Sequence, residues 1–505
     1  MPNISQITAV LLACALTAGM ATNASGAVAG ADLPDLGNPS GRAMSADKAQ
    51  RIGARVIANL HSKGLVLEDP QLVTFIRSIG QRLLSNIETN DQDVQYYVLK
   101  LSALNSFALP GGNIGIFTGM ISETDNESEL AALMAHETAH VVQHHIAREA
   151  EQMEGIGWQN LALILAGAIA GASTGNADAI PAAVSGGLTH LMKQRAGYTE
   201  AHEYEADRIG IKTLAKADFD PHAMVTLFQK FQRQRQSHSS NEILPTFLNH
   251  PLPGTRIAEA AERAVGQPKR KVRTSSIYPL MRERARIMQS SRMDKLRARY
   301  KSRIATGEAN AANAYGYALT LMRLGKNSQA IDILTPYAQA HPNQAPWQLA
   351  LASAEKSSGQ RQHALKRLRQ AKTRFPSNSA VKLAYASTLL AVGKPAAMRD
   401  FLLSQNQVLK QWPKAQHLLA KGANRQKRLG EAYYRRAKAY AMRGAYPGAI
   451  NQLRSALQTA ELNSYNKSRL SALRTQFARK CNHTYGTDHC RRAVEHLAKR
   501  NSSAG

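Results

Sequence analysis

The stretch that decides the fold is LAALMAHETAHVVQHHIA, residues 130–147. Its apolar residues recur at helical spacing, which predicts a buried helix. Within it, His136 and His140 are four residues apart, so both imidazoles lie on one helix face and can converge on one metal ion. Glu137 follows the first histidine, where its carboxylate can reach a water held by that metal. The pattern indicates metal-assisted hydrolysis with two His ligands and a Glu general base.

Such a five-residue pattern also arises by chance, and a helical His pair can be a solvated surface feature. The apolar neighbours favour burial instead, and a buried His-His-Glu cluster needs polar partners, which a metal supplies.

A third metal ligand is expected in AHEYEADRIGIKTLAKAD, residues 201–218. Glu203 and Asp207 are four apart on a second amphipathic helix and share a face, whereas Glu205 points away from them. Glu203 completes a His-His-Glu zinc site that leaves one position for water. Asp207 is placed to accept a hydrogen bond from the other ring nitrogen of a ligand histidine. The alternative is an ordinary acidic helix face. Three nearby histidines are expected to be exposed polar residues: His144, His145 and His202.

These motifs resemble those of the zinc metallopeptidase family that includes the CAAX prenyl proteases and the bacterial HtpX proteases. The resemblance rests on HETAH at 136–140, EYEAD at 203–207, NSFALPGGNIGIF at 105–117 and HPLPGTRI at 250–257, and covers about residues 45–265. Within the family, the chain resembles the periplasmic members that join the peptidase to a tetratricopeptide domain.

The resemblance implies an α+β zincin-type domain, mostly helical, with a small sheet and an exposed edge strand. It implies one Zn²⁺ per chain, bound by His136, His140 and Glu203. Glu137 is the general base that takes a proton from water and passes it to the leaving amine. Asp207 orients a ligand histidine or, in some descriptions of the family, donates a proton.

Substrate is expected to bind as an added strand beside the catalytic helix. We predict one strand over residues 107–117, which begins with a Pro-Gly-Gly segment; the alternative is a plain core strand. The residues predicted to bind substrate are Phe107, Ala108, Gly112, Asn113 and Ile114.

His250 lies in a loop that Pro251 and Pro253 hold extended. By resemblance it lies near the metal, where it either stabilises the oxyanion of the transition state or occupies the open metal position and keeps the enzyme latent. A loop histidine without a role is the alternative. Arg256, by the same resemblance, supports the site.

The N-terminus predicts export. The apolar run Ile7–Met20 is too short to span a bilayer and fits a secretory signal, with a small-residue cleavage site at Ala27-Val28-Ala29. A basic n-region is missing, and the sequence before Cys14 faintly resembles a lipoprotein box. No run is long enough for a membrane-integral peptidase, so a periplasmic protein, soluble or peripheral, is expected.

Outside the signal, Cys481 and Cys490 are the remaining cysteines, and in an exported chain they predict one short-loop disulfide. The formal net charge is +28, and residues 269–303 are dense in Arg and Lys. We favour anionic lipid headgroups or acidic protein surfaces as partners, and no nucleic acid; a solvated basic helix is the alternative. The Ala/Gly/Leu-rich segment Gly155–Gly187 is predicted to be a buried helix over the active site or a mobile lid.

The C-terminal half contains a repeat. Gly325, Gly359 and Gly393 are spaced by 34 residues, each between two helical segments, which is the tetratricopeptide period. Gly444 follows Gly393 by 51 residues, so either the register slips or an extra helix intervenes. At least four repeats are expected between residues 308 and 462, and such stacks form concave surfaces that bind extended segments or proteins.

The predicted domains are a signal peptide (1–29), a zinc metallopeptidase (30–265), a basic helical linker (266–305), tetratricopeptide repeats (306–465) and a C-terminal segment with the disulfide (466–505). The resemblance implies cleavage of unfolded or misassembled outer-membrane β-barrel proteins, contact with their assembly machinery through the repeats, and a chaperone-like role in assembly. A binding or chaperone scaffold with a mostly latent zinc site is the competing function, and a cytosolic basic binding protein is a third.

Overall fold

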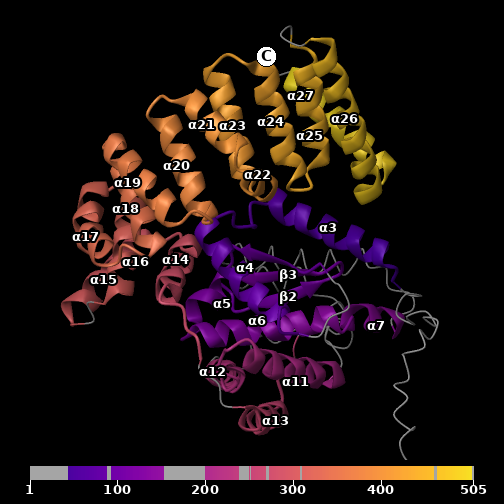
Figure 1. Cartoon of the computed structure of the whole chain (residues 1–505). Coiled ribbons are helices and arrows are strands. Elements are labelled where there is room, and N and C mark those ends of the chain that lie inside the picture. The colour runs from indigo at the N-terminus through magenta and orange to yellow at the C-terminus, as the bar shows by residue number, and fades with distance from the viewer. Residues whose placement is uncertain are drawn as a thin grey trace, which may run out of the picture.

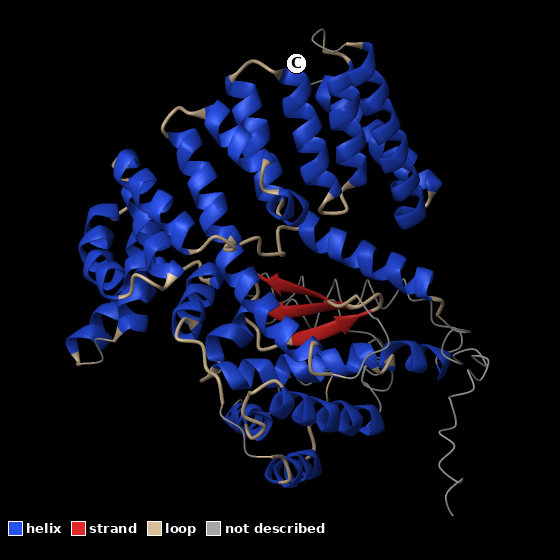
Figure 2. Ribbon diagram, viewed as in Figure 1, coloured by secondary structure: helices blue, strands red, loops and turns tan. Residues whose placement is uncertain are grey.

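The computed structural model describes residues 44–87, 93–152, 200–237, 250, 252–268, 272–307, 310–459 and 463–502. Two predicted features lie outside these residues: the export signal, including Cys14, and the segment Gly155–Gly187. The chain forms an N-terminal α+β part around a small sheet and a C-terminal part of stacked helices (Figures 1 and 2). The predicted fold class is confirmed.

The sheet is the centre of the N-terminal part and has the strand order β1-β3-β2. Strand β3 is parallel to β1 and antiparallel to β2, so among the described residues β2 pairs on one side only and is an edge strand. The elements of this part are α3 (Ala46–Ser62), α4 (Pro70–Leu84), β1 (Gln95–Leu99), β2 (Ser106–Leu109), β3 (Asn113–Phe117), α5 (Thr118–Glu123), α6 (Glu127–Val142), α7 (His145–Gln152), α11 (Glu200–Lys216), α12 (Ala223–Ser237) and α13 (Gly254–Val265).

The prediction of one strand over residues 107–117 is wrong, because the chain reverses after Leu109. Gly111 and Gly112 have φ angles of +76° and +77°, a conformation that side chains disfavour. The Asn113 amide donates to the Pro110 carbonyl oxygen at 3.1 Å and closes the turn. The segment is therefore a hairpin of β2 and β3.

The two faces of the sheet bury different helices. Phe107 and Leu109 point toward α3, whereas Ile114 and Ile116 belong to the core that contains α6. This follows from the alternation of side chains along a strand. The sheet therefore lies between α3 and α6, and α11, α12 and α13 lie beyond α6 (Figure 1).

The stretch predicted as a basic helical linker forms α14 (Tyr278–Gln289) and α15 (Met293–Ala305). Helix α14 is not a solvated helix, because Leu280, Met281 and Ile287 are buried and it packs on α5. Its Arg284 donates to both carboxylate oxygens of Asp69 at 2.7 and 2.6 Å. Part of the basic charge therefore joins the two halves of the chain.

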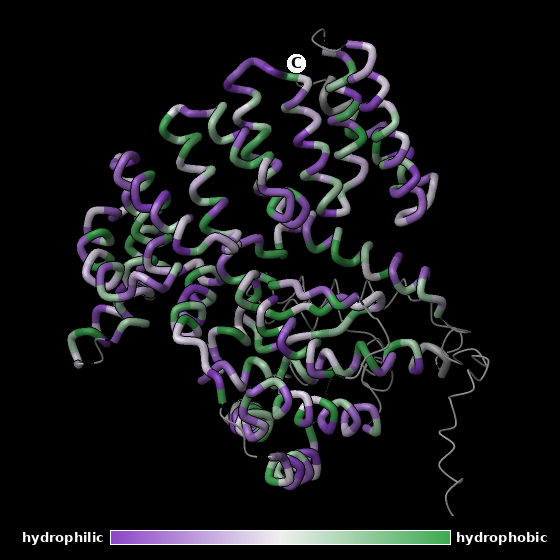
Figure 3. Tube along the Cα trace, in the orientation of Figure 1, coloured by the Kyte–Doolittle hydropathy of each residue, from purple (hydrophilic) through white to green (hydrophobic). Residues whose placement is uncertain are grey.

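The helices of the C-terminal part form stacked antiparallel pairs (Figure 1). They are α16 (Ala311–Arg323), α17 (Asn327–Ala340), α18 (Ala345–Ser357), α19 (Arg361–Arg374), α20 (Ser379–Ala391), α21 (Pro395–Leu403), α22 (Asn406–Gln411), α23 (Pro413–Arg425), α24 (Leu429–Ala441), α25 (Tyr446–Leu457), α26 (Ser464–Tyr485) and α27 (Thr487–Ser502). Hydrophobic residues gather around the sheet and between paired helices, whereas α19 is largely hydrophilic (Figure 3).

The structure explains the irregular glycine spacing. Gly325, Gly359 and Gly393 all have positive φ in the turns inside helix pairs, and Lys427, 34 residues after Gly393, has φ +57° in the corresponding turn between α23 and α24. The period therefore continues through a lysine. Gly444 lies in the turn between α24 and α25, half a repeat later, and the short α22 is an extra helix.

The repeats dock on α3 and the loop that follows it. Arg443 donates to both oxygens of Glu68 at 2.5 Å each and contacts His417 Nε2 at 2.9 Å. Gly444 lies directly against Ala58 of α3, where an added Cβ would be 2.9 Å from the alanine Cβ.

The predicted disulfide between Cys481 and Cys490 is present and joins α26 to α27. None of the described helices is both long enough and apolar enough to cross a bilayer.

Candidate metal centre

Helix α6 carries the HETAH motif through the centre of the N-terminal part. The Asn126 side chain caps its start by accepting from the Glu129 backbone amide at 2.9 Å. Acidic residues occupy the first turn, where they complement the helix dipole. All sixteen residues of α6 are buried, so His136 and His140 face protein and not solvent.

Helix α11 supplies the carboxylates. Glu203 and Asp207 are one turn apart on the face that packs on α6, and both are buried. Gly210 lies on the same face, where an added Cβ would be at ordinary contact distance, 3.5 Å, from the His136 backbone nitrogen and at 3.0 Å from Met224 Cε. Glu203 oxygens lie 3.5 Å from His136 Nε2 and 3.4 Å from His140 Nε2. The structure thus brings together the three residues that sequence reasoning grouped as ligands.

His250 reaches the same point from outside these two helices. Its Nδ1 lies 2.8 Å from a Glu203 oxygen and 3.3 Å from His136 Nε2. Its Nε2 lies 3.5 Å from Glu137 Oε1. Ligand atoms of His136, His140, Glu203 and His250 all lie within 4.8 Å of one another.

The cluster fits a divalent cation. The Nε2 atoms of His136 and His140 are 3.0 Å apart, and each ring directs its Nδ1 at another polar group, so the two Nε2 lone pairs converge next to the Glu203 carboxylate. Converging lone pairs and a buried negative charge are costly without a positive charge between them. Two imidazoles and one carboxylate form a donor set that catalytic zinc sites use.

The electrostatics of the histidines agree with this fit. Burial alone would lower the pKa of His136, but Asp207 and Glu203 outweigh it and raise the pKa to about 10, so the site favours a positive charge. Burial and the adjacent His136 hold the pKa of His140 well below its usual value, which keeps that ring in the neutral form that binds a metal. Although burial opposes ionisation, His250 and His136 hold the pKa of Glu203 well below its usual value.

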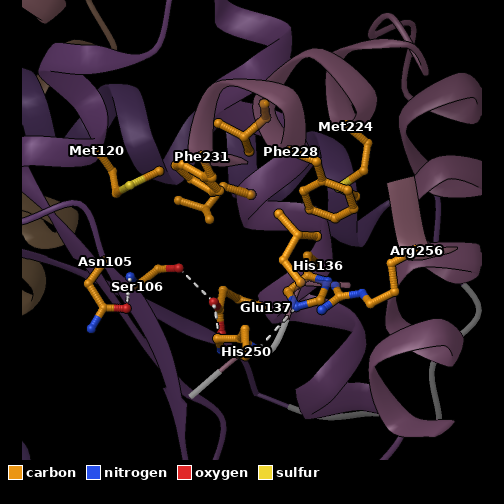
Figure 4. A pocket seen from close by; sticks show the side chains of 13 residues that line it. Asn105, Ser106, Met120, His136, Glu137, Met224, Phe228, Phe231, His250 and Arg256 are labelled. Atoms are coloured by element: carbon orange, nitrogen blue, oxygen red, sulfur yellow. Dashed lines mark hydrogen bonds and ion pairs between the residues drawn. The ribbon is translucent and has the colours of Figure 1, made fainter. Parts of the chain in front are cut away.

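Glu137 is held in position by Ser106 at the start of the edge strand. The Ser106 hydroxyl donates to Glu137 Oε1 at 2.6 Å (Figure 4). Among the described residues, the other oxygen, Oε2, has no hydrogen-bond partner although it is buried. A buried acceptor without a partner is the group expected to meet a water at the metal. Sequence reasoning quoted Ser106 within a motif but gave it no role.

Arg256 binds both carboxylates of α11. It donates to Asp207 through Nε at 2.8 Å and Nη2 at 2.9 Å, and its Nη1 lies 2.7 Å from Glu203. Asp207 in turn lies 3.0 Å from His136 Nδ1. The buried guanidinium therefore fixes the two acidic groups that contact the histidines, as its predicted supporting position requires.

The prediction that His145 and His202 are exposed is wrong. His145 is completely buried, with Nδ1 2.7 Å from His140 Nδ1 and Nε2 3.1 Å from Glu205. His202 stacks on it with ring centroids 4.4 Å apart. Arg148 holds Glu205 from the other side at 3.0 Å. The available signal was spacing, because residue 145 lies five positions after the second HETAH histidine, at the start of α7.

The residues predicted to bind substrate are divided by the hairpin. Phe107 and Ala108 lie on the edge strand β2. Gly112 lies in the turn, and Asn113 and Ile114 lie on the central strand β3, whose two sides are already paired. An added strand can therefore pair with β2 but not with β3.

Comparison with known proteins gives a consistent result. Residues 70–264 match the family described as Peptidase family M48. The β-barrel assembly-enhancing protease of Escherichia coli O157:H7 is 31% identical over 446 residues, which cover 87% of this chain and 90% of that protein. A putative β-barrel assembly-enhancing protease of Vibrio cholerae is 31% identical over 317 residues, covering 62% and 64%. The mitochondrial metalloendopeptidase OMA1 of Schizosaccharomyces pombe is 28% identical over 159 residues, covering 31% and 43%.

Proposed function

We propose, from the premise that this chain belongs to peptidase family M48, that it is a periplasmic zinc endopeptidase that cleaves misassembled outer-membrane β-barrel proteins. Membership of the family confirms the expected enzyme class, a metalloendopeptidase. The convergence of His136, His140 and Glu203 beside Glu137 carries the catalytic part of the proposal. The names of the bacterial relatives support the substrate.

His136, His140 and Glu203 would hold the metal. When bound, a zinc ion supplies Lewis acidity that makes a water acidic and polarises the scissile carbonyl. Glu137 takes the water proton at Oε2, while the Ser106 hydroxyl fixes its other oxygen, and then passes the proton to the leaving amine. Asp207 accepts from His136 Nδ1 and so directs Nε2 at the metal position.

The substrate would bind along β2 as an added strand. The side of β2 that no described strand pairs with offers main-chain groups to an extended peptide, and Ser106 at its start contacts Glu137 directly. An unassembled β-barrel protein exposes many strands of this kind because its own edges are unpaired. Phe107 and Ala108 are the proposed pairing residues.

His250 would either latch the site or serve the transition state. Its contacts with Glu203 and Glu137 agree with both roles, because an imidazole in this position can act as an extra metal ligand or can donate a hydrogen bond to an oxyanion. If it is a latch, His250→Ala raises basal proteolysis at saturating zinc. Unchanged or lost activity rules out the latch.

The repeats would recruit the substrate and the assembly machinery. Stacked helix pairs bind extended segments or partner proteins on their concave surface. The predicted signal supports a periplasmic location, and the Arg- and Lys-rich residues 269–303 support peripheral contact with anionic membranes. We propose no nucleic-acid partner.

The second candidate function is a binding or chaperone scaffold whose zinc site is mostly latent. The observation that favours it is His250, which lies against both Glu203 and Glu137. Under this alternative the repeats assist assembly, and cleavage is occasional.

The deciding experiment measures metal content and cleavage of an unfolded β-barrel protein by the full chain. Glu137→Gln is compared with wild type and with Glu200→Gln, which changes an exposed carboxylate on α11. The proposal expects one zinc per chain and loss of cleavage in Glu137→Gln only. Cleavage that persists in Glu137→Gln refutes the peptidase assignment. If Glu137→Gln loses cleavage but still assists the assembly of β-barrel proteins, the peptidase and chaperone functions coexist.

A further inference from the structure

An apolar pocket opens directly beside the general base. It is bounded by Asn105, Ser106, His136, Glu137, His250 and Arg256 on its polar side, and its enclosed volume is about 40 Å³. In Figure 4 the apolar side chains occupy the side opposite Ser106, Glu137 and His250. The labelled ones are Met120, Met224, Phe228 and Phe231, and the pocket is also lined by Leu133, Leu227 and Leu252.

We infer that this pocket binds a large apolar side chain of the substrate, from a residue that flanks the scissile bond. The inference rests on the proposed peptidase function and adds the chemical class of the residue that is recognised. Preferred residues are Leu, Met and Phe.

The position of the pocket follows from helix α6. Leu133 lies one turn before His136, so it is on the same helix face, and Glu137 stands next to that histidine. A peptide whose scissile carbonyl lies at the metal position therefore places a neighbouring side chain within reach of Leu133. The bond to be cut and the pocket are adjacent because one helix forms both.

The edge strand sets the direction from which a side chain arrives. Ser106 lies on the face of β2 that carries Ala108 and faces α6, whereas Phe107 faces α3. A peptide paired with β2 alternates in the same way, so every second side chain points toward the α6 side and one of them meets the pocket. Transmembrane β-strands alternate apolar and polar residues with this same period, so an unassembled strand supplies an apolar residue at the required position.

The walls of the pocket select against charge. The guanidinium of Arg256 is engaged by Asp207 and Glu203 and lies 5.2 Å from the centre of the Phe228 ring, so it is committed to holding the site. A carboxylate or ammonium in the pocket would lose its hydration among methionine and phenylalanine side chains, which is costly. Met120 and Met224 are flexible and can adapt to apolar groups of different shape.

The test uses the zinc-loaded full chain and a peptide library with one varied position on each side of a fixed cleavage site. We expect kcat/KM to fall at least about tenfold when Leu is replaced by Ala, Asp or Lys at one flanking position. Binding of the same peptides to Glu137→Gln, measured as Kd without cleavage, should show the same order.

Two variants with matched controls locate the preference. Phe231→Leu should shift selectivity toward Trp, and Leu133→Phe toward smaller residues, each by about threefold or more. Phe75→Leu makes the same change as Phe231→Leu at a similarly buried ring in α4, and should leave selectivity unchanged.

Each outcome is decisive. Cleavage with no apolar preference at either flanking position overturns the inference while the peptidase assignment stands. Unchanged selectivity in both Phe231→Leu and Leu133→Phe, with folded proteins, also overturns it. No cleavage of any peptide by wild type and by His250→Ala overturns the proposed function and this inference together.

Discussion

His145 should control metal affinity although it does not belong to the ligand set. If His140 directs the Nε2 lone pair at the metal, its Nδ1 carries the proton and donates to His145 Nδ1 across 2.7 Å. His145 Nε2–H then donates to Glu205 at 3.1 Å. Burial lowers the pKa of His145 to about 4 despite Glu205, so the ring is neutral near pH 7 and can accept this bond. The chain orients His140 as Asp207 orients His136.

The size of the effect follows from what each substitution removes. Loss of a hydrogen-bond partner behind a ligand histidine weakens metal binding about 10- to 100-fold, or about 1.4–2.8 kcal/mol. His145→Leu removes the acceptor and should produce a loss in this range. His145→Gln retains an amide acceptor and should recover part of it. Glu205→Gln acts one step further away, on a side chain that is 36% exposed, so its loss should be below tenfold.

The assay is competition for zinc between the full chain and a chelator of known affinity at constant pH. His363→Gln, a substitution of an exposed histidine in α19, is the control and should bind zinc as wild type does. At saturating zinc, His145→Leu should regain a large part of its proteolytic activity, because its defect is in affinity. A folded His145→Leu protein whose zinc Kd is within twofold of wild type would refute the reasoning and leave His145 as a core residue only.

Three further results are expected. Gly444→Ala and Gly325→Ala both place a side chain at positive φ, at a cost of about 1–2 kcal/mol, but only Gly444→Ala presses on α3 and should speed hydrogen exchange there. Burial lowers the pKa of His61 to about 4, so protonation of His61 favours the unfolded chain. The free energy of unfolding should therefore fall as the pH drops from about 6.5 to 4, by at most about 3 kcal/mol. In His61→Gln the melting temperature should depend less on pH over this window. Replacing Cys481 and Cys490 by Ala should cost about 2–3 kcal/mol, seen in urea as earlier unfolding of the C-terminal helices, whereas reducing agent should have no further effect on this variant.

The parts of the site that could be predicted are those in which potential metal ligands and their carboxylate partners are spaced at the period of a helix. Residues four apart on an amphipathic helix share a face, so the histidine pair and the Glu203–Asp207 pair could be predicted before any tertiary contact was known. The 34-residue period was equally readable, because glycine occupies three successive positive-φ turns, at residues 325, 359 and 393. These signals are local, and the structure preserves them.

The parts that could not be predicted depend on contacts between distant segments. A strand and a hairpin differ by one turn, and the Pro-Gly-Gly sequence fits both the entry to a strand and the turn that Gly111 and Gly112 form. His145 looked polar and exposed because its partner Glu205 is supplied by a helix 60 residues away. The 34-residue spacing cannot be followed past Gly393 in the sequence, because the next equivalent turn contains Lys427 and a lysine at positive φ gives no compositional signal.

The position of the sheet limits how the repeats can deliver a substrate. Helix α3 covers one face of the sheet and contacts the repeats through α26, whereas α6 covers the other face and carries the metal cluster (Figure 1). A protein that the repeats hold next to α3 is separated from Glu137 by the sheet, whereas α20 of the repeats contacts α4 on the α6 side of the sheet. One route past the sheet follows the edge strand β2, where Ser106 contacts Glu137, the proposed general base. Only an extended chain can pair with such an edge, and a folded barrel has no free strand to offer β2. A substrate that the repeats recruit must therefore also contain an unassembled strand to be cleaved.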